Sequence, residues 1–474
     1  MAPQITLALI KPEIMVASLA VIVLLMGLFR PLRSLIIPAT LLGLILTFYY
    51  ALTMWGKWGT GFNNMVVRDP LSLSFDYIFL TGALLSVLIS SHFFRRIVNQ
   101  GEYIALMLFS TVGMMLMALA GDLIVLFLGL ETMSIALYVL VGFRRANEKS
   151  LEAALKYFLL GAFATGFLLY GMAFMYGSTG TTNLRMIISL LKTGSVSPGM
   201  YLYIGMGLLL VGFGFKVALV PFHSWTPDVY EGAPTPVTAF MSAGAKGAGF
   251  AAFLRVFLEA AGSLHASWTP LLWMIAVVTM TLGNVAALTQ TNIKRMLAYS
   301  SIAHAGYVLM GIVAATSSAY SAVLFYLLAY TFMKLGAFGL VEYLERKDRE
   351  TLNISDYAGL GLSRPWVGIA MTIFMLSLAG FPPTIGFIGK FFIFRSAVEA
   401  GFIGLTVIAV LNSLVSVYYY IGVVVVMYMR EPVIDFNQIP KKPLVATALI
   451  LACAAILFFG LRPDSVMAYL MGAF

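Results

Sequence analysis

Five lysines and one glutamate stand inside apolar stretches that are long enough to cross a membrane. The lysines are Lys156, Lys216, Lys246, Lys334 and Lys390, and the glutamate is Glu131. A charged side chain in the hydrocarbon core costs about 3 kcal/mol or more on most scales, so each of these must face a partner or a wet interior. Because burial disfavours the ammonium form, a lysine there can hold and release a proton near physiological pH. The six residues therefore predict proton transfer.

Glu131 lies in the middle of the apolar stretch 123–140, with no cation near it along the chain. We expect its partner to come from another helix and to be a lysine. While such a pair is closed the lysine stays protonated, and when the pair opens the proton can move on. A static ion pair that locks two helices together is the alternative.

Two of the lysines stand beside prolines that interrupt an apolar run. Pro221 follows Lys216 by five residues, and Pro382-Pro383 precedes Lys390. Proline removes a backbone donor, and freed backbone groups inside a membrane must be satisfied by other helices, polar side chains or water. We therefore predict a broken helix beside each of these lysines.

The remaining candidates have a structural alternative each. Small residues surround Lys246, which allows either tight helix packing or room for water. Histidine is the side chain that titrates closest to neutral pH, so His304 can relay protons between lysines, or it is a hydrogen-bonded structural histidine. Lys156 lies near the start of its run, so its ammonium can instead reach the membrane surface. Lys334 is the most ambiguous of the lysines.

The composition identifies a membrane protein. The chain is 61% hydrophobic and only 10% charged, whereas a soluble domain is about one quarter charged. The single cysteine, Cys453, excludes an internal disulfide framework and a thiolate-held zinc or iron–sulfur site. The basic residues do not form one patch, so nucleic acid is not expected as a partner. No phosphate-binding loop, metal-spaced cluster or nucleophile motif is evident, so we expect no cofactor and no metal in this chain.

Fourteen apolar runs are long enough for spanning helices, and they are too long for the strands of a barrel. We therefore predict an all-α polytopic membrane protein. The first run is expected to be a retained span, with a removed signal peptide as the alternative. The runs are 8–29, 34–54, 72–93, 103–120, 122–143, 152–177, 201–222, 235–258, 268–289, 298–316, 319–342, 365–394, 402–428 and 444–461.

The loop cations set the expected orientation. Loops after odd-numbered runs carry sixteen lysines and arginines, against eight on the other side. Positive loops stay in the cytoplasm, so both termini are expected on the outer, periplasmic side of a bacterial plasma (inner) membrane. The charged segment 342–350 is expected to be a solvated cytoplasmic loop.

An internal repeat is visible in short matches separated by 169 to 175 residues. An offset of five helices gives the copies opposite orientations, and inverted repeats with broken helices are typical of transporters. We predict N-terminal helices at 1–100, a first repeat at 101–262, a second, inverted repeat at 263–430 and a last helix at 431–474. The matches are Tyr138-Val-Leu-Val-Gly142 with Tyr307-Val-Leu-Met-Gly311, Gly161-Ala-Phe163 with Gly336-Ala-Phe338, and Lys216 with Lys390.

Several motifs resemble those of the antiporter-like subunits of respiratory complex I (NADH:quinone oxidoreductase), which are similar to the large subunits of Mrp-type cation/proton antiporters. The similarity runs through nearly the whole chain. The N type fits best, because the M type typically has glutamate at the position of Lys390 and the L type is much longer. The motifs are Leu128-Gly-Leu-Glu131, Pro221-Phe-His-Ser-Trp-Thr-Pro-Asp228, Lys294-Arg-Met-Leu-Ala-Tyr-Ser-Ser-Ile-Ala-His304 and Gly386-Phe-Ile-Gly-Lys390.

The resemblance implies two inverted five-helix bundles around a hydrophilic axis. By this resemblance, Glu131 and Lys216 form a switching pair, which Lys156 modulates. Lys246 and His304 form a central relay, and Lys390 is the terminal proton site. Relatives often carry a histidine four residues before the position of Lys334. Tyr330 stands there instead, which puts a relay role for Lys334 in doubt.

The expected function is that of a proton-translocating subunit of a redox-driven translocase, with no redox centre of its own. Flavin, iron–sulfur clusters and quinone are expected in partner subunits. The expected partners are M-type and small K-type membrane subunits, lipid, protons and internal water. The alternatives are an Mrp-type antiporter subunit, a complex fed by ferredoxin, deazaflavin or photosynthetic donors, and an inactive scaffold.

Overall fold

The computed structural model describes residues 7–95, 97–345, 352–436 and 439–471. Most of them are helical, with one two-stranded antiparallel hairpin of β1 (Gly59–Gly61) and β2 (Val66–Arg68). The helices are α1 (Lys11–Leu28), α2 (Ile36–Thr53), α3 (Pro70–Phe94), α4 (Gln100–Leu119), α5 (Leu123–Val141), α6 (Glu148–Thr179), α7 (Leu184–Lys192), α8 (Met200–Val217), α9 (Trp225–Gly232), α10 (Thr235–Phe253), α11 (His265–Leu288), α12 (Ile293–Ala314), α13 (Ser317–Leu344), α14 (Leu360–Ser363), α15 (Pro365–Ala379), α16 (Ile385–Glu399), α17 (Ile403–Met429), α18 (Pro443–Leu461) and α19 (Asp464–Met471).

Thirteen helical segments in the described part of the chain are long and apolar enough to cross a membrane. The remaining predicted run, 365–394, is split into α15 and α16. A span of about 20 residues covers the hydrocarbon thickness of a bilayer, so these lengths match the requirement. The predicted all-α polytopic membrane fold is confirmed.

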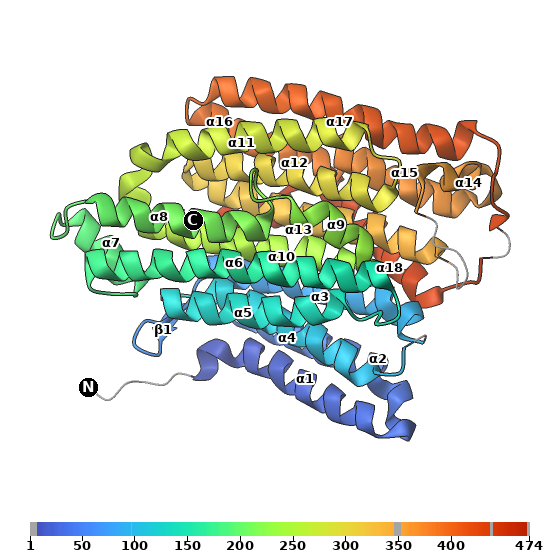
Figure 1. The fold of residues 1–474 in the computed structure, drawn as a ribbon, viewed down its shortest axis with the longest axis horizontal. Helices are drawn as coiled ribbons and strands as arrows, with labels where there is room; N and C mark the ends of the chain where they lie inside the picture. The colour runs from blue at the N-terminus through green and yellow to red at the C-terminus, as the bar shows by residue number, and fades with distance from the viewer. Residues whose placement is uncertain (1–6, 96, 346–351, 437–438, 472–474) are drawn as a thin grey trace.

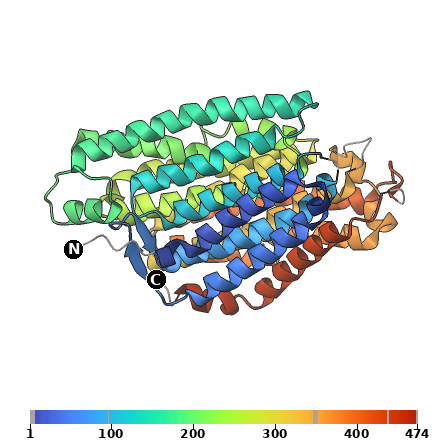
Figure 2. The ribbon, with the colours of Figure 1, turned by 90° about the horizontal axis from the view of Figure 1, so that it is seen from below.

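The spanning helices run side by side along one direction (Figure 1), with α1 at one edge and α17 at the other. The central helices α10, α12 and α13 are almost entirely buried inside the chain, whereas α1, α2, α6, α17 and α18 expose much of their apolar surface. An apolar outer surface is what lipid requires, and Lys246, His304 and Lys334 lie on the buried helices α10, α12 and α13. Figure 2 shows the same bundle from below.

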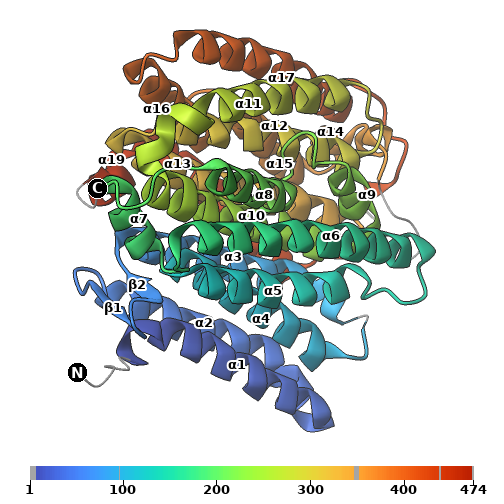
Figure 3. The ribbon, with the colours of Figure 1, turned by 60° about the vertical axis from the view of Figure 1, so that its left-hand side comes forward.

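The two ends of the described chain lie at the same end of the bundle, on either side of the β-hairpin and the turn before it. Arg68 of β2 donates to the carbonyl oxygen of Leu9, and the ring of Trp55, which follows α2, packs on Tyr469 of α19 at 6.0 Å. Figure 3 shows β1, β2, α7 and α19 together at this end. We call it the hairpin end, and the other the opposite end. An even number of spans predicts this arrangement.

Which side of the membrane the hairpin end faces stays a prediction. Four of the cations behind the predicted orientation, Arg96, Arg346, Lys347 and Arg349, lie outside the described residues.

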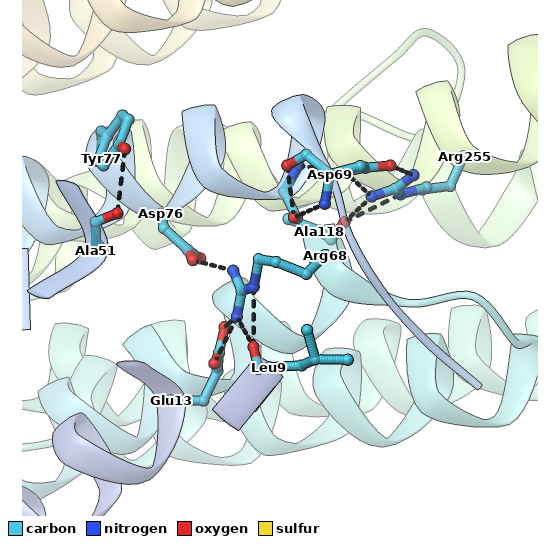
Figure 4. A network of polar contacts seen from close by, with 10 residues as sticks. Leu9, Glu13, Ala51, Arg68, Asp69, Asp76, Tyr77, Ala118 and Arg255 are labelled. Carbon is cyan, nitrogen blue, oxygen red and sulfur yellow. Dashed lines mark hydrogen bonds and ion pairs between the residues drawn. The ribbon is translucent and has the colours of Figure 1, made fainter. Parts of the chain in front are cut away.

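Arg68 ties the hairpin to the first and third helices. Its buried guanidinium lies 2.7 Å from Glu13 of α1 and 2.5 Å from Asp76 of α3 (Figure 4). The next residue, Asp69, caps α3 through the amide of Ser72. A buried arginine requires such carboxylate and carbonyl partners. The loop therefore fixes how α1 and α3 sit relative to each other.

The internal repeat has a counterpart in the backbone. The amide of Leu123 donates to Thr182 at 3.0 Å, and that of Leu184 donates to Gly121 at 2.9 Å. The same two bonds recur 170 residues later, from Ile293 to Leu352 and from Ile354 to Thr291.

The two copies of this backbone link lie at opposite ends of the bundle. The first copy lies at the hairpin end, where Asn183 also binds the carbonyl oxygen of Asn64. The second lies at the other end of the bundle (Figure 1). This geometry agrees with inverted copies, while the predicted domain boundaries stay predictions.

One expectation from the sequence is wrong. Glu342 and Glu345, at the start of the segment expected to be solvated, are 1% and 2% exposed. Lys442, before α18, donates to the carbonyl oxygens of both, and Glu345 also binds Arg144 and Thr235. Alternating charges in a short loop suggest an exposed surface, but here Glu342 and Glu345 belong to or directly follow the buried helix α13. Residues 346–350 lie outside the described part of the chain.

Candidate functional site

Both predicted helix breaks are present. Helix α8 ends at Val217 and α9 begins at Trp225, while α15 ends at Ala379 and α16 begins at Ile385. Proline cannot donate in a helix and clashes with the preceding turn, which explains why the chain breaks where Pro221 and Pro382-Pro383 occur. In the first break, a hydroxyl of another helix (Thr279 of α11) accepts from the freed amide of Val220 at 3.1 Å.

Lys216 is buried at the end of α8, next to the first break. Its ammonium donates to the hydroxyl of Ser134 at 2.7 Å and to that of Tyr138 at 3.3 Å, both on α5. It also lies 5.5 Å from the ring centre of Tyr157 on α6, a distance at which a cation is attracted by the ring. Neutral hydroxyls and aromatic faces therefore surround this ammonium.

Glu131 lies on α5, three residues before Ser134, and is half-buried. Its carboxylate accepts a hydrogen bond from Thr165 of α6 at 2.8 Å. The partner comes from another helix, as expected, but it is a threonine. In the described part of the chain no ion pair joins Glu131 to Lys216. Because residues three apart share a helix face, the carboxylate still lies next to the hydroxyl that holds Lys216. In this structure the pair is open.

Lys390 lies against the second break. It sits on α16, and its ammonium donates to the carbonyl oxygens of Leu378 and Ala379 at the end of α15, at 3.1 and 2.8 Å. Ser413 of α17 accepts from it at 2.9 Å. The last carbonyls of a helix have no partner within the helix and carry its partial negative charge, so they favour a cation. The break thus creates the site for this lysine.

Lys246 and Lys334 both reach α12. Lys246 of α10 donates to the carbonyl oxygen of Ser301. Lys334 of α13 donates to the carbonyl oxygen of Leu297 and to the hydroxyl of Ser300, at 2.8 Å each. The ring centre of Tyr330 lies 5.9 and 5.6 Å from their ammonium nitrogens. Both lysines are buried, and the same aromatic ring is within the range at which it attracts each ammonium.

His304 is connected to Lys334 through hydroxyl groups and reaches a further tyrosine. Its Nε2 lies 3.1 Å from the hydroxyl of Tyr420, and its Nδ1 lies 2.5 Å from that of Tyr326. Tyr420 in turn shares a hydrogen bond with Ser300. The bonds form a continuous path from Lys334 through Ser300, Tyr420 and His304 to Tyr326.

Sequence reasoning missed Ser300, Tyr420 and Tyr326, and it left Lys334 unassigned. One signal was available, because Ser300 precedes His304 by four residues and therefore shares its helix face. Nothing local points to Tyr420, which lies more than 100 residues away.

Lys156 belongs to a separate group at the opposite end. Helix α6 begins four residues earlier than expected, and Lys156 pairs with Asp228 of α9 at 2.5 Å. Asp228 also accepts from Arg295 of α12 at 2.8 Å. A cavity of about 240 Å³ opens beside these three residues. Although partial burial disfavours its charged form, the bonds from Lys156 and Arg295 hold the pKa of Asp228 below its ordinary value.

The lysines, His304 and the hydroxyls around them can accept protons and pass them on. Hydroxyls and imidazole both donate and accept hydrogen bonds, so they can pass a proton without gaining net charge. Nowhere in the described ranges do three histidine, cysteine or carboxylate side chains gather as metal ligands would.

The sequence comparisons agree with this geometry. A family model described as NADH:quinone oxidoreductase/Mrp antiporter, transmembrane, matches residues 120–416. NADH-quinone oxidoreductase subunit N of Trichlorobacter lovleyi is 51% identical over 468 residues, which cover 98% of this chain and 96% of that protein. The chain belongs to the NADH-quinone oxidoreductase subunit N family.

Solved structures agree with membership of the subunit N family. A chain of respiratory complex I from Thermus thermophilus with bound aureothin has a TM-score of 0.84 and is 36% identical, with 98% of this chain and 100% of that chain covered. A chain of the Mrp complex from Dietzia sp. DQ12-45-1b has the same TM-score at 20% identity, covering 98% and 97%, and thus shares the fold. The predicted resemblance to the N type is confirmed, and the chain is a membrane subunit of an NADH-quinone oxidoreductase that works with other membrane subunits.

Proposed function

We propose that this chain carries protons through the membrane arm of an NADH-quinone oxidoreductase, along a path of buried lysines, histidine and hydroxyls. One observation carries the proposal. Among the described contacts, the ammonium groups of Lys216, Lys246, Lys334 and Lys390 bind hydroxyls and carbonyls rather than carboxylates. A purely structural buried lysine is expected to have a carboxylate partner. Since a hydroxyl can accept from an ammonium or donate to a neutral amine, it accommodates a lysine in either protonation state.

The switch begins at Glu131. When Thr165 releases the carboxylate, Glu131 can turn to Lys216 and stabilise its ammonium. When Thr165 takes it back, Lys216 loses that stabilisation, and its proton passes through the hydroxyl of Ser134 or Tyr138, whose oxygen accepts it as the hydroxyl releases its own proton to water. Water then carries the proton to Lys246. From there it passes to the path of Lys334 and His304, and finally to Lys390.

Lys156 modulates the switch by position. It precedes Tyr157, whose ring faces Lys216 and stacks on Trp225 at 4.6 Å. Through Asp228, which lies on the same short helix as Trp225, the state of Lys156 can shift that aromatic pair and the surroundings of Lys216.

The energy comes from elsewhere in the complex. Flavin, iron–sulfur clusters and quinone lie in partner subunits, and M-type and K-type membrane subunits transmit the effect of quinone reduction to Glu131. The complex sits in the bacterial plasma (inner) membrane, with the hairpin end outside.

The test compares proton pumping with quinone reduction in inverted membrane vesicles. Lys216→Ala and Glu131→Ala are compared with wild type and with Lys57→Ala, which removes an exposed loop lysine. Because removal of a proton-transfer group typically costs 10²–10⁴-fold, we expect both activities to fall by about tenfold or more in the first two variants only. Assembly of the complex is checked in each.

Other outcomes would point to other functions. Full pumping and full quinone reduction in an assembled Glu131→Ala complex would make the buried charges structural and the chain a scaffold. Loss of sodium or potassium exchange driven by a pH gradient, with redox-driven pumping intact, would favour a cation/proton antiporter. Activity with ferredoxin or reduced deazaflavin in place of NADH would reassign the electron donor only.

A further inference from the structure

A cavity of about 390 Å³ opens at the hairpin end, far along the bundle from the group around Lys156. Charged side chains line much of it, from the loop before α3, from α7 and from the last turns of the tenth helix. This volume holds several water molecules. The charged lining consists of Asp69, Arg185, Lys192, Arg255 and Glu259.

The central helix α10 connects the proposed path to this cavity. It carries Lys246 and continues past Phe253 as a π-helical segment, Leu254–Ala260. Such segments are rare and occur frequently at functional sites, because the wider turn re-aims side chains. Here the segment carries Arg255, which is buried, and Glu259, whose side chain is 31% exposed.

Two carboxylates share the one guanidinium of Arg255, and they share it unequally. Asp69 binds it through both oxygens, at 2.6 and 2.7 Å (Figure 4), and Asp69 is also fixed as the cap of α3. Glu259 binds a single nitrogen at 3.0 and 3.2 Å. The carbonyl oxygen of Ala118 takes two further guanidinium bonds. If Glu259 is neutralised, Arg255 therefore keeps a close ion pair and is not left as an unpaired buried charge.

We infer that Glu259 is the group through which this chain exchanges protons with water at the hairpin end. This inference rests on the proposed function and adds to it a branch that leaves the path at His304 and leads to water at the hairpin end, beside the step to Lys390. Glu259 is the more exposed of the two carboxylates, the more weakly bound and the one whose neutralisation leaves Arg255 paired.

The path from the relay to Glu259 runs along α13, which packs on α10. His304 binds Tyr326 of this helix. Six residues earlier, about 9 Å along the helix axis, Tyr320 lies within electrostatic range of Glu259 and Arg255. On our inference, a short chain of water molecules joins the two tyrosine hydroxyls, since water commonly links buried polar groups that are too far apart for a direct bond.

The proton balance is simple. A proton given by His304 to the oxygen of Tyr326 releases the hydroxyl proton of Tyr326 to the bridging water, and the last donor in the chain protonates the Glu259 carboxylate. The carboxylic acid then returns its proton to cavity water as hydronium. The charged and titratable groups near Glu259 are Arg255, Asp69, Arg185, Lys192 and Tyr320.

The first test is Glu259→Gln, with Glu399→Gln as the matched control. Glu399 also pairs with an arginine four residues earlier, Arg395 at 2.7 Å, but it lies on α16 outside this cavity. We expect Glu259→Gln to lower the number of protons pumped per NADH about tenfold, Glu259→Asp to restore most of it, and Glu399→Gln to match wild type. Normal pumping in an assembled Glu259→Gln complex would overturn the inference.

The second test is access, which does not depend on pumping. The chain has one cysteine, Cys453, so Cys453→Ala provides a background without thiols in this chain. In that background Glu259→Cys is expected to react with a membrane-impermeant thiol reagent added from the hairpin side only. Reaction from the other side only, or no reaction while the exposed control Lys57→Cys reacts, would also overturn the inference.

Lys246→Met distinguishes a failure of the proposed proton path from a failure of the role inferred for Glu259. If it leaves pumping intact, the proposed function fails together with its branch. If it abolishes pumping while Glu259→Gln does not, only the branch fails.

Discussion

The ammonium of Lys390 lies 2.8 Å from the carbonyl oxygen of Ala379, the last residue of the helix before its own. The next residue, Gly380, has a φ of +90°, and a Cβ on it would meet Cδ of Lys390 at 3.0 Å and Nζ at 3.3 Å. The backbone of the break and the lysine are therefore packed against each other. A side chain at Gly380 would push Lys390 off the carbonyls that hold it.

This relationship predicts that Gly380→Ala impairs function beyond its cost in stability. Positive φ costs a residue with a Cβ roughly 1–2 kcal/mol, and displacement of Lys390 should lower proton pumping about tenfold. The measurement is pumping per NADH oxidised, together with the thermal unfolding of the purified complex.

Gly401 provides the control for Gly380. It has a φ of +86°, and a Cβ on it would meet no other atom within 4 Å. Gly401→Ala should therefore show a similar loss of stability with normal pumping. Equal pumping in the two variants would mean that the contact with Lys390 is unimportant.

Much of the fold was predictable because a bilayer imposes a simple length rule. Thirteen of the predicted runs correspond to helices that are long enough to span, and the prolines located both breaks. The buried lysines were evident from their apolar surroundings alone. The starts of helices were less certain, as α6 shows, because flanking polar residues such as Glu148 belong to the helix without being apolar.

The sequence alone did not identify the residues that form hydrogen bonds with the candidate proton-transfer groups. Thr165 holds Glu131, and Tyr420 links Ser300 to His304, across separations of 34, 120 and 116 residues. Threonine, serine and tyrosine are common in spanning helices, so type alone does not select them. Only the packing of α5 on α6, and of α12 on α17, brings these hydroxyls to the charged groups.

The hydroxyl of Tyr420 is predicted to be necessary for the relay. Tyr420→Phe keeps the ring and removes the only described link between Ser300 and His304. We expect proton pumping to fall about tenfold, with quinone reduction slowed in parallel.

Tyr103→Phe is the matched control for Tyr420→Phe. Tyr103 is also fully buried, and it binds Ser90 at 3.0 Å away from the path. Tyr103→Phe loses one buried hydrogen bond and Tyr420→Phe loses two, so we expect destabilisation by about 1 kcal/mol and about 2 kcal/mol, respectively. A pumping defect of the same size in Tyr103→Phe would attribute the effect to general destabilisation.

Thr165 is predicted to set the resting position of Glu131. A hydrogen bond to a charged group contributes about 1.5–3 kcal/mol, so Thr165→Val should favour the closed pair of Glu131 with Lys216. Lys216 would then release its proton less readily, and turnover should fall several-fold. Thr132→Val is the control, because Thr132 only binds its own helix, at Leu128. Unchanged turnover in Thr165→Val would show that this hydrogen bond does not bias the switch.

The group around Asp228 predicts how stability depends on pH at the opposite end. The carboxylate is partly desolvated, which opposes ionisation, yet Lys156 and Arg295 lower its pKa overall. A group whose pKa is lower in the folded state contributes stability above its unfolded value, about 3.9 for aspartate. This contribution is lost as the pH falls through the lower folded value. Asp228→Asn should therefore lower the unfolding temperature at neutral pH, and the difference from wild type should shrink below about pH 4.

The size of this effect is limited by exposure. The side chains of Lys156 and Asp228 are each 36% exposed, and pairs in contact with water contribute about 1 kcal/mol or less. Glu152→Gln is the control, since Glu152 lies 3.9 Å from the same ammonium with 74% of its side chain exposed, and it should leave the unfolding temperature unchanged. A difference between Asp228→Asn and wild type that did not shrink as the pH fell below about 4 would mean that Asp228 stabilises the fold through something other than its charge. The ion pair of Lys156 with Asp228 would then not explain how Lys156 affects the aromatic pair of Tyr157 and Trp225.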